Sequence, residues 1–340
     1  MKPLISVGLL AVLIVNADCA KVTANHNQPL ETISSSATAE TAATFETFVD
    51  WCHNQASLTP AARYTVEVLL KIVGTSDCNQ AEAMLTNLTE LDLSAQTITD
   101  VTPLASLTNL ASLYLDRNQI VDVTPLASLI QLTSLDLTSN QIVDVTPLAS
   151  LHQLHQLSLS FNRIADAAPL VSLTQLTELN LIDNHIADMA PLASLTQLTE
   201  LNLGDNQIAE VTPLTSLTQL TELDLWDNQI ADLAPLNNLT NLTSLGLSDN
   251  QIVDLGHLTQ LTNLTSLRLS NNQIADLTPL SNLTSLTDLA LGFNQITDIA
   301  PLASLTNLTE LDLSHNQIVD VAPLANLPNP SVIWLWSNNI

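Results

Sequence analysis

Carboxylates recur at a fixed interval of 22 residues in the middle of the sequence. They form two series, one of glutamates and one of aspartates: Glu178, Glu200 and Glu222, and Asp183, Asp205, Asp227 and Asp249. If the fold stacks these positions about 5 Å apart, the like charges repel and favour a basic partner, a cation or solvent. Ca²⁺ binds several oxygens at once, but no loop with calcium-binding spacing occurs, so no metal site is predicted. The two series favour either a solvated face or contact with a basic protein surface.

A few aromatic and charged side chains interrupt the same regular sequence. Trp226 occupies a position that Gly204 holds 22 residues earlier, and large aromatic residues are frequent anchors of protein interfaces. We predict that a partner contacts the following residues: Tyr114, Phe161, Glu178, Glu200, Glu222, Asp224, Trp226, Asp227, Arg268 and Phe293. Two alternatives stay open. The aromatic residues are tolerated drift, since single exposed apolar residues are ordinary, or a glycan stacks on Trp226 while Asp224 and Asp227 accept hydrogen bonds from its hydroxyl groups.

Residues for catalysis or for cofactor binding are not grouped in the sequence. His152 and His155 are neighbours, but His185, His257 and His315 are scattered. No Ser/His/Asp arrangement and no glycine-rich phosphate loop occurs, and the chain has only six glycines. The sequence therefore predicts a protein that is not an enzyme and that needs no cofactor.

The elements that position these residues come from one repeated unit. Eleven copies of the 22-residue pattern L-x-x-L-x-x-L-x-L-x-x-N-x-I-x-D-x-x-P-L-x-x run from Leu85 to Asn326, and a partial twelfth runs from Leu327 to Ile340. This period and leucine spacing are typical of a leucine-rich repeat array. Leu223 and Leu225 alternate with polar residues, which predicts a strand with leucines inward and its other side chains outward. The predicted fold class is α/β: a leucine-rich repeat solenoid with a curved parallel β-sheet on its concave face and short helical turns on its convex side.

Two polar positions of the unit are expected to have structural roles. The asparagine series from Asn118 to Asn316 turns inward after each strand and bonds the backbone of neighbouring coils, because a buried amide needs partners. The aspartate series that includes Asp122 and Asp144 caps a helical turn whose backbone the following proline fixes. The outward positions of the strands remain free for function.

Three segments precede the repeats, which occupy residues 85–340. Residues 1–20 contain one lysine, an apolar run and small residues after it, which predicts a cleaved secretory signal peptide. Residues 21–44 are rich in Ser, Thr, Ala and Asn and are predicted to be a flexible linker. Residues 45–84 show helical spacing, with Thr59 as N-cap, Pro60 in the first turn and Gly74 at the end. We predict that this last segment is a helical N-terminal cap.

Cys52 and Cys78 flank the predicted cap. Two cysteines in a small element of an exported protein usually pair, and closing this loop stabilises by roughly 3 kcal/mol in the chain-entropy model. Two buried free thiols are the alternative, whereas a metal site lacks enough nearby ligands. The favoured prediction is a disulfide in a protein that is secreted or held in the cell envelope.

The charge balance excludes some partners. With 34 acidic and 7 basic residues, the formal net charge is −27, so nucleic acid and anionic membrane surfaces repel the protein. No stretch after the signal peptide is apolar enough for membrane insertion. The expected partner is a protein with a basic surface, or else a glycan.

The motif LxxLxxLxLxxNxIxDxxPL resembles the 22-residue repeats of the internalins and their bacterial relatives. The helical block with Trp51, Cys52 and Cys78 resembles the N-terminal caps of secreted bacterial leucine-rich repeat proteins. This resemblance extends from Phe45 to the end, and it implies a curved solenoid whose concave sheet binds another protein. The chain is accordingly predicted to be a non-enzymatic, exported protein-binding module. Carbohydrate or cell-envelope ligand binding at the same face and a purely structural spacer are the alternatives.

Overall fold

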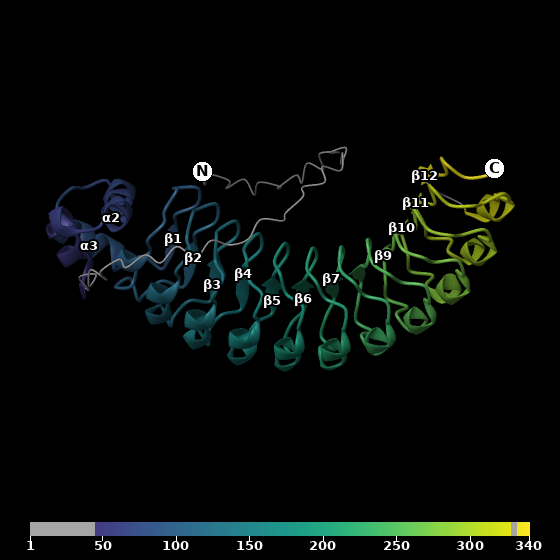
Figure 1. Cartoon of the computed structure of the whole chain (residues 1–340), viewed down its shortest axis with the longest axis horizontal. Coiled ribbons are helices and arrows are strands. Elements are labelled where there is room, and N and C mark those ends of the chain that lie inside the picture. The colour runs from purple at the N-terminus through teal and green to yellow at the C-terminus, as the bar shows by residue number, and fades with distance from the viewer. Residues whose placement is uncertain (1–44, 328–331) are drawn as a thin grey trace, which may run out of the picture. The chain divides into compact units, whose positions relative to one another are not determined.

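A computed structural model describes residues 45–327 and 332–340. The predicted signal peptide (1–20) and linker (21–44) lie outside the described residues. From Phe45 on, a group of short helices leads into a solenoid of repeats, as Figure 1 shows. No helix in the described ranges combines the length and the apolar character needed to cross a membrane.

From Phe45 to the repeats, the described chain forms four short helices: α1 (Phe48–His53), the 3₁₀ helix η1 (Gln55–Ser57), α2 (Pro60–Val73) and α3 (Cys78–Leu85). The Thr59 hydroxyl accepts a hydrogen bond from the Ala62 amide at the start of α2, and Gly74 ends it with a φ of 72°. Cys52 and Cys78 form a disulfide with Cα atoms 5.6 Å apart, which confirms the predicted pairing over two free thiols. The bond ties α1 to α3 beside the first repeat.

Each repeat contributes one three-residue strand to a parallel sheet whose described strands follow chain order. The strands are β1 (Glu90–Asp92), β2 (Ser112–Tyr114), β3 (Ser134–Asp136), β4 (Gln156–Ser158), β5 (Glu178–Asn180), β6 (Glu200–Asn202), β7 (Glu222–Asp224), β8 (Ser244–Gly246), β9 (Ser266–Arg268), β10 (Asp288–Ala290), β11 (Glu310–Asp312) and β12 (Val332–Trp334). In register, Leu201 pairs with Leu223, and Leu223 pairs with Leu245. These middle leucines are buried while their neighbours face out, which confirms the predicted alternation and the solenoid fold.

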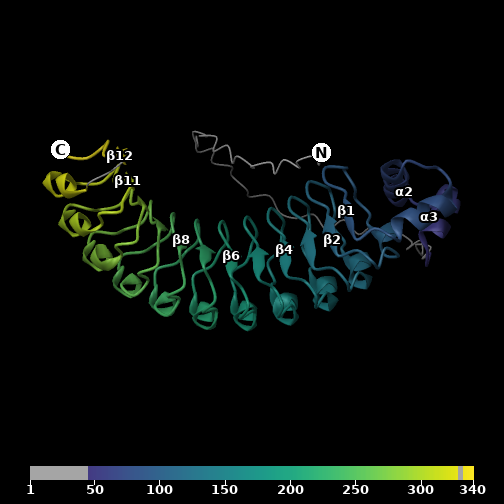
Figure 2. The same cartoon turned by 180° about the vertical axis from the view of Figure 1, so that it is seen from behind.

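The outer edge of the solenoid carries short 3₁₀ helices, which Figures 1 and 2 show opposite the strands. They are η2 (Thr102–Leu104), η3 (Thr124–Ser128), η4 (Thr146–Ser150), η5 (Ala168–Ser172), η6 (Ala190–Ser194), η7 (Thr212–Ser216), η8 (Ala234–Leu236), η9 (Gly256–Leu258), η10 (Thr278–Asn282), η11 (Ala300–Ser304) and η12 (Ala322–Asn326). A carboxylate oxygen of Asp122 accepts a hydrogen bond from the Thr124 amide at 2.8 Å, and Asp144 does the same for Thr146. The predicted capping by aspartate is confirmed, and the helical turns are of the 3₁₀ type.

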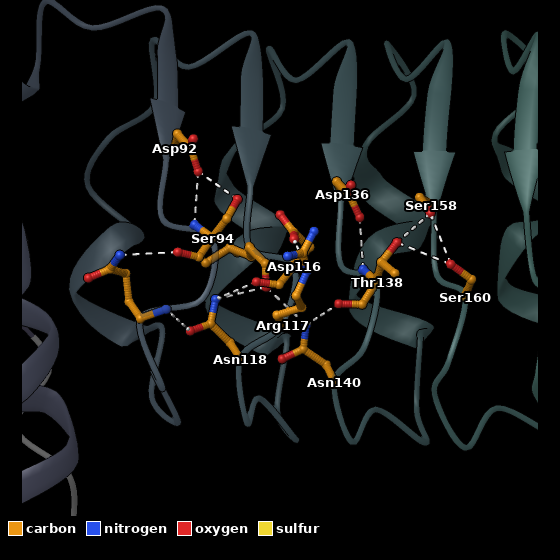
Figure 3. A network of polar contacts seen from close by, with 12 residues as sticks. Asp92, Ser94, Asp116, Arg117, Asn118, Asp136, Thr138, Asn140, Ser158 and Ser160 are labelled. Atoms are coloured by element: carbon orange, nitrogen blue, oxygen red, sulfur yellow. Dashed lines mark hydrogen bonds and ion pairs between the residues drawn. The ribbon is translucent and has the colours of Figure 1, made fainter. Parts of the chain in front are cut away.

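A ladder of buried asparagines joins the coils to one another. The Oδ1 atom of Asn140 accepts a hydrogen bond from the Ile120 amide at 2.9 Å. Its Nδ2 atom donates to the carbonyls of Leu115 and Leu137, each at 3.0 Å. Figure 3 shows Asn118 and Asn140 just beyond the ends of their strands. The predicted role of this series is confirmed, and it satisfies backbone groups that would otherwise be buried without partners.

The chain turns sharply two residues after each buried leucine that follows a strand. The residue at this turn has a positive φ in successive repeats, for example 53° at Asp205 and 48° at Asp227. Trp226 and Asp227 therefore follow strand β7 (Glu222–Asp224) rather than lying on it.

Candidate functional site

The concave face is made by the first and third residues of each strand. Because the strands pair without offset, equivalent residues form straight rows across the sheet. Glu178 is opposite Glu200, and Glu200 is opposite Glu222. We call these three residues the glutamate row. The predicted glutamate series is therefore a continuous feature of one surface, with neighbours one strand spacing apart, about 4.8 Å.

A hollow of about 320 Å³ lies on the concave face over β2 to β6. We call it the N-terminal hollow. Its polar and aromatic lining comprises Tyr114, Ser134, Asp136, Gln156, Ser158, Glu178, Asn180, Glu200 and Asn202. The structure thus brings together three of the predicted contact residues, Tyr114, Glu178 and Glu200. The lining contains carboxylates, amides and hydroxyls but no basic side chain, so its charge is negative.

The electrostatics of the glutamate row reflect its crowding. Partial burial raises the pKa of Glu200, and the neighbouring carboxylates of Glu178 and Glu222 raise it further. Glu178 accepts a hydrogen bond from the Gln156 side chain at 2.9 Å. Within the described residues, the only ion pair within 4.0 Å joins Arg117 to Asp116, away from this row. The row therefore has no ion-pair partner in the described part of the chain.

Trp226 lies against Gly204 of the preceding repeat. A Cβ atom placed on Gly204 would be 2.1 Å from Nε1 of the Trp226 indole, so the indole occupies the space above this glycine. Trp226 is consequently only partly exposed. The change from glycine to tryptophan between successive repeats is thus one matched arrangement: the small residue makes room for the large one.

Asp224 packs in a similar way against a glycine of the following repeat. Its carboxylate fills the space above Gly246, where an added Cβ would be 2.3 Å from Oδ1. The same oxygen accepts a hydrogen bond from the Trp226 amide at 3.1 Å. Burial raises the pKa of Asp224, and the opposing effects of this hydrogen bond and of the Arg268 charge only partly offset it. Asp224 and Trp226 therefore pack against the sheet between two glycines.

Each residue of the aspartate series lies at the turn that follows a strand. Burial raises the pKa of Asp205 and of Asp227, and the negative charges of the neighbouring aspartates raise it further. In the described part of the chain, no three His, Cys, Asp or Glu side chains come together in a group that could hold a metal ion. The positive φ at these positions was not predicted from the sequence, although polar residues such as Asp and Asn tolerate this conformation best.

Phe161, Phe293 and Arg268 lie apart from the N-terminal hollow. Phe161 and Phe293 are half-exposed at the turn, in repeats far from each other. Sequence reasoning treated His315 as isolated, but its ring stacks on Phe293 with centroids 3.9 Å apart and meets the edge of Trp336 at 4.4 Å. The 22-residue spacing of Phe293 and His315 was the signal that could have revealed this contact. Arg268 lines a second, smaller hollow on β9 to β12.

Comparison with known proteins agrees with this geometry. The sequence family described as Leucine Rich repeats (2 copies) matches residues 86–128, 130–172, 174–216, 218–260, 262–304 and 306–340. Among solved structures, an internalin (inlF) from Listeria monocytogenes is similar at 34% identity and a TM-score of 0.79, over 88% of this chain and 86% of that one. Internalin C2 (inlC2) of the same species is similar at 44% identity and a TM-score of 0.54, over 55% and 83% respectively.

A further similar structure is the functional domain of InlJ from Listeria monocytogenes. It has 28% identity and a TM-score of 0.56, over 72% of this chain and 62% of that one. None of the curated protein sequences compared matches the chain.

Proposed function

Because the chain belongs to the leucine-rich repeat proteins of the internalin type, we propose that it is a non-enzymatic, exported module that binds a protein with a basic surface. The contact surface in this proposal is the concave face. Its centre is the N-terminal hollow together with the glutamate row.

One observation carries the proposal: Glu178, Glu200 and Glu222 are paired in register on an open surface, and none of them forms an ion pair with another described residue. Burial first, and the neighbouring like charges in addition, disfavour the ionised state of Glu200 and raise its pKa. A lysine or arginine from a partner would relieve this repulsion. Complementary charge of this kind mainly increases the rate and the specificity of association.

The remaining predicted residues extend this surface. Tyr114 lines the N-terminal hollow and offers its ring to a cation or an apolar side chain. Asp224, Trp226 and Asp227 continue the surface from β7 toward the turn. The asparagine ladder fixes the backbone beneath, so little ordering entropy opposes binding. Phe161 lies at the turn after β4, in a repeat that lines the N-terminal hollow, whereas Arg268 and Phe293 would be reached only by a partner that spans several repeats.

The proposal is tested by capture of partners from envelope and culture extracts with three baits: the native protein, Glu200→Lys and Glu210→Lys. Glu210 is exposed two residues before the outer helix η7, so the control changes the net charge equally but away from the concave face. We expect Glu200→Lys to lose at least 90% of a partner that Glu210→Lys retains. Retention should also fall as salt rises, because exposed charges are screened within about 8 Å at physiological ionic strength. Equal retention by all three baits would exclude the glutamate row.

Export is tested separately. Mass spectrometry of the protein from culture medium and envelope fractions should find an N-terminus near residue 20 and a mass consistent with an oxidised Cys52–Cys78 pair. An intact Met1 in a protein that stays in the cytoplasmic fraction would contradict export.

A further inference from the structure

The second hollow of the concave face lies over β9 to β12 and measures about 110 Å³. We call it the C-terminal hollow. Its lining is chemically mixed: one guanidinium, three carboxylates, an indole and small apolar groups. The residues are Leu267, Arg268, Asp288, Leu289, Ala290, Glu310, Asp312 and Trp334. It differs from the N-terminal hollow, which contains no basic side chain.

The strand register arranges these groups in order. Arg268 is opposite Ala290, Ala290 is opposite Asp312, and Asp312 is opposite Trp334. Arg268 and Trp334 are therefore separated by three strand steps, or roughly 14 Å between their backbones. The small side chain of Ala290 leaves open the space beside Arg268. In the adjacent row Asp288 pairs with Glu310. Glu310 and Asp312, which carry two of the three carboxylates, therefore both lie on β11, next to the strand β12 that carries Trp334.

The charged groups of the hollow are only partly satisfied by the described residues. Arg268 is exposed, and no carboxylate in the described ranges lies within 4.0 Å of its guanidinium. One oxygen of Asp312 accepts a hydrogen bond from the Ser314 amide at 2.9 Å, and one oxygen of Asp288 accepts from the Thr287 hydroxyl at 3.2 Å. Trp334 is 40% exposed and therefore accessible to a ligand, whereas the second oxygen of Asp312 lies over Gly292.

We propose that the C-terminal hollow binds a zwitterion in which an ammonium group and a phosphate are joined by a short linker, as in phosphocholine. The ammonium group lies against Trp334 between Glu310 and Asp312, because an indole face and carboxylates both attract a cation. The phosphate meets Arg268, whose planar guanidinium donates two parallel hydrogen bonds to such an anion. This site shares only Arg268 with the proposed protein-binding surface and concerns a small molecule.

The charge balance of the hollow selects this class of ligand. A simple anion would meet three carboxylates for one guanidinium and would be repelled. A simple cation would leave Arg268 with only the more distant charge of Asp224 as its partner. A zwitterion satisfies both ends at once, and its orientation is set by the order of Arg268, Asp312 and Trp334 across the strands.

Calorimetric titration of the purified protein with phosphocholine, choline and inorganic phosphate tests the proposal. We expect phosphocholine to bind at least tenfold more tightly than choline, and inorganic phosphate to show no binding at the same concentrations. Equal affinities for phosphocholine and choline would overturn it, because Arg268 would then contribute nothing. Absence of phosphocholine binding would overturn it as well.

Three variants localise the interaction. Arg268→Gln should lower the affinity for phosphocholine about tenfold, to the level of choline, and leave choline binding unchanged. Trp334→Leu should weaken both ligands, with circular dichroism checking that the fold is retained. Arg117→Gln removes an exposed arginine outside the hollow and should bind phosphocholine as the native protein does. Equal losses in Arg117→Gln and Arg268→Gln would overturn the assignment to the hollow.

Phosphocholine can come from a lipid headgroup or from a soluble or polymer-attached group. Cosedimentation with phosphatidylcholine vesicles identifies the lipid source, whereas binding of soluble phosphocholine without cosedimentation identifies the other. Both results uphold the chemistry of the site. The inference fails independently of the proposed function, since Glu200→Lys should retain phosphocholine binding and Trp334→Leu, at a residue outside the predicted protein contacts, should retain the protein partner.

Discussion

The indole of Trp226 covers Gly204 of the neighbouring repeat, so closely that no side chain fits at residue 204 while the ring stays in place. Gly204 does not have a positive φ, and its backbone conformation is therefore open to any residue. The requirement for glycine at this position comes from space alone. The pair links two adjacent coils on the concave side of the solenoid.

Gly204→Ala should destabilise the native protein by about 1–3 kcal/mol, the usual cost of overpacking. In a Trp226→Ala background the same change should be neutral within about 0.5 kcal/mol, because the space above residue 204 is then free. A double-mutant cycle from urea unfolding measures this coupling. Additive effects of the two substitutions would show that the indole does not depend on Gly204.

Asn206→Ala should lower the free energy of unfolding by about 2–4 kcal/mol, because it leaves buried backbone groups without partners. The Oδ1 atom of Asn206 accepts a hydrogen bond from the Ile186 amide at 3.0 Å, and Nδ2 donates to the Leu181 and Leu203 carbonyls. The adjacent Gln207 is exposed, so Gln207→Ala is the control and should change stability by less than about 0.5 kcal/mol. Denaturant unfolding of both variants compares them; similar small effects would contradict the ladder's role.

Replacing both Cys52 and Cys78 by serine should cost about 3 kcal/mol, since the bond closes a loop of 26 residues in the unfolded chain. Thermal unfolding with and without a thiol reductant measures the effect. The reductant should lower the Tm of the native protein to that of the double variant and leave the variant itself unchanged. If the disulfide is shown to be reduced and the Tm of the native protein does not change, the predicted stabilisation by the disulfide is contradicted.

Asp224→Asn should stabilise the protein at pH 7. The pKa of Asp224 is raised in the fold, so its ionised form is disfavoured there and folding becomes less favourable as pH rises through that pKa. The native protein should accordingly gain stability from this group as pH falls from neutral toward 3.8, and the asparagine variant should lack that part of the gain. Asn180 occupies the equivalent position and makes the same bond, from the Ile182 amide at 3.1 Å, so asparagine fits.

The pH profile has an opposite branch at lower pH. Hydrogen bonds from neighbouring threonines lower the pKa of Asp144 and of Asp276, whose contribution to stability is present above 3.8 and lost as pH falls through the folded pKa. Stability should therefore pass through a maximum on the acidic side of neutrality. Unfolding free energies measured from pH 7 to pH 3 check both branches, and a monotonic decline from pH 7 downward would contradict the raised pKa of Asp224, Glu200, Asp205 and Asp227.

The repeated unit by itself determined the fold of this protein. Leucines at alternating positions require a strand with one buried face. A period of 22 residues requires that each coil of the solenoid stack on the next, equivalent coil. The same 22-residue repetition accounts for the buried Asn140, the capping Asp122 and the glutamate row of Glu178, Glu200 and Glu222. Such features are predictable because they depend only on the spacing along the chain.

The tertiary structure decided how side chains of neighbouring repeats share the space between them. The packing of Trp226 over Gly204, of Asp224 over Gly246 and of His315 on Phe293 depends on the direction in which each side chain leans. That direction is set by contacts across two coils and by the positive φ at the turn, neither of which the pattern of one repeat contains. For the same reason, only the register of four strands brought Arg268 and Trp334 to opposite ends of one hollow.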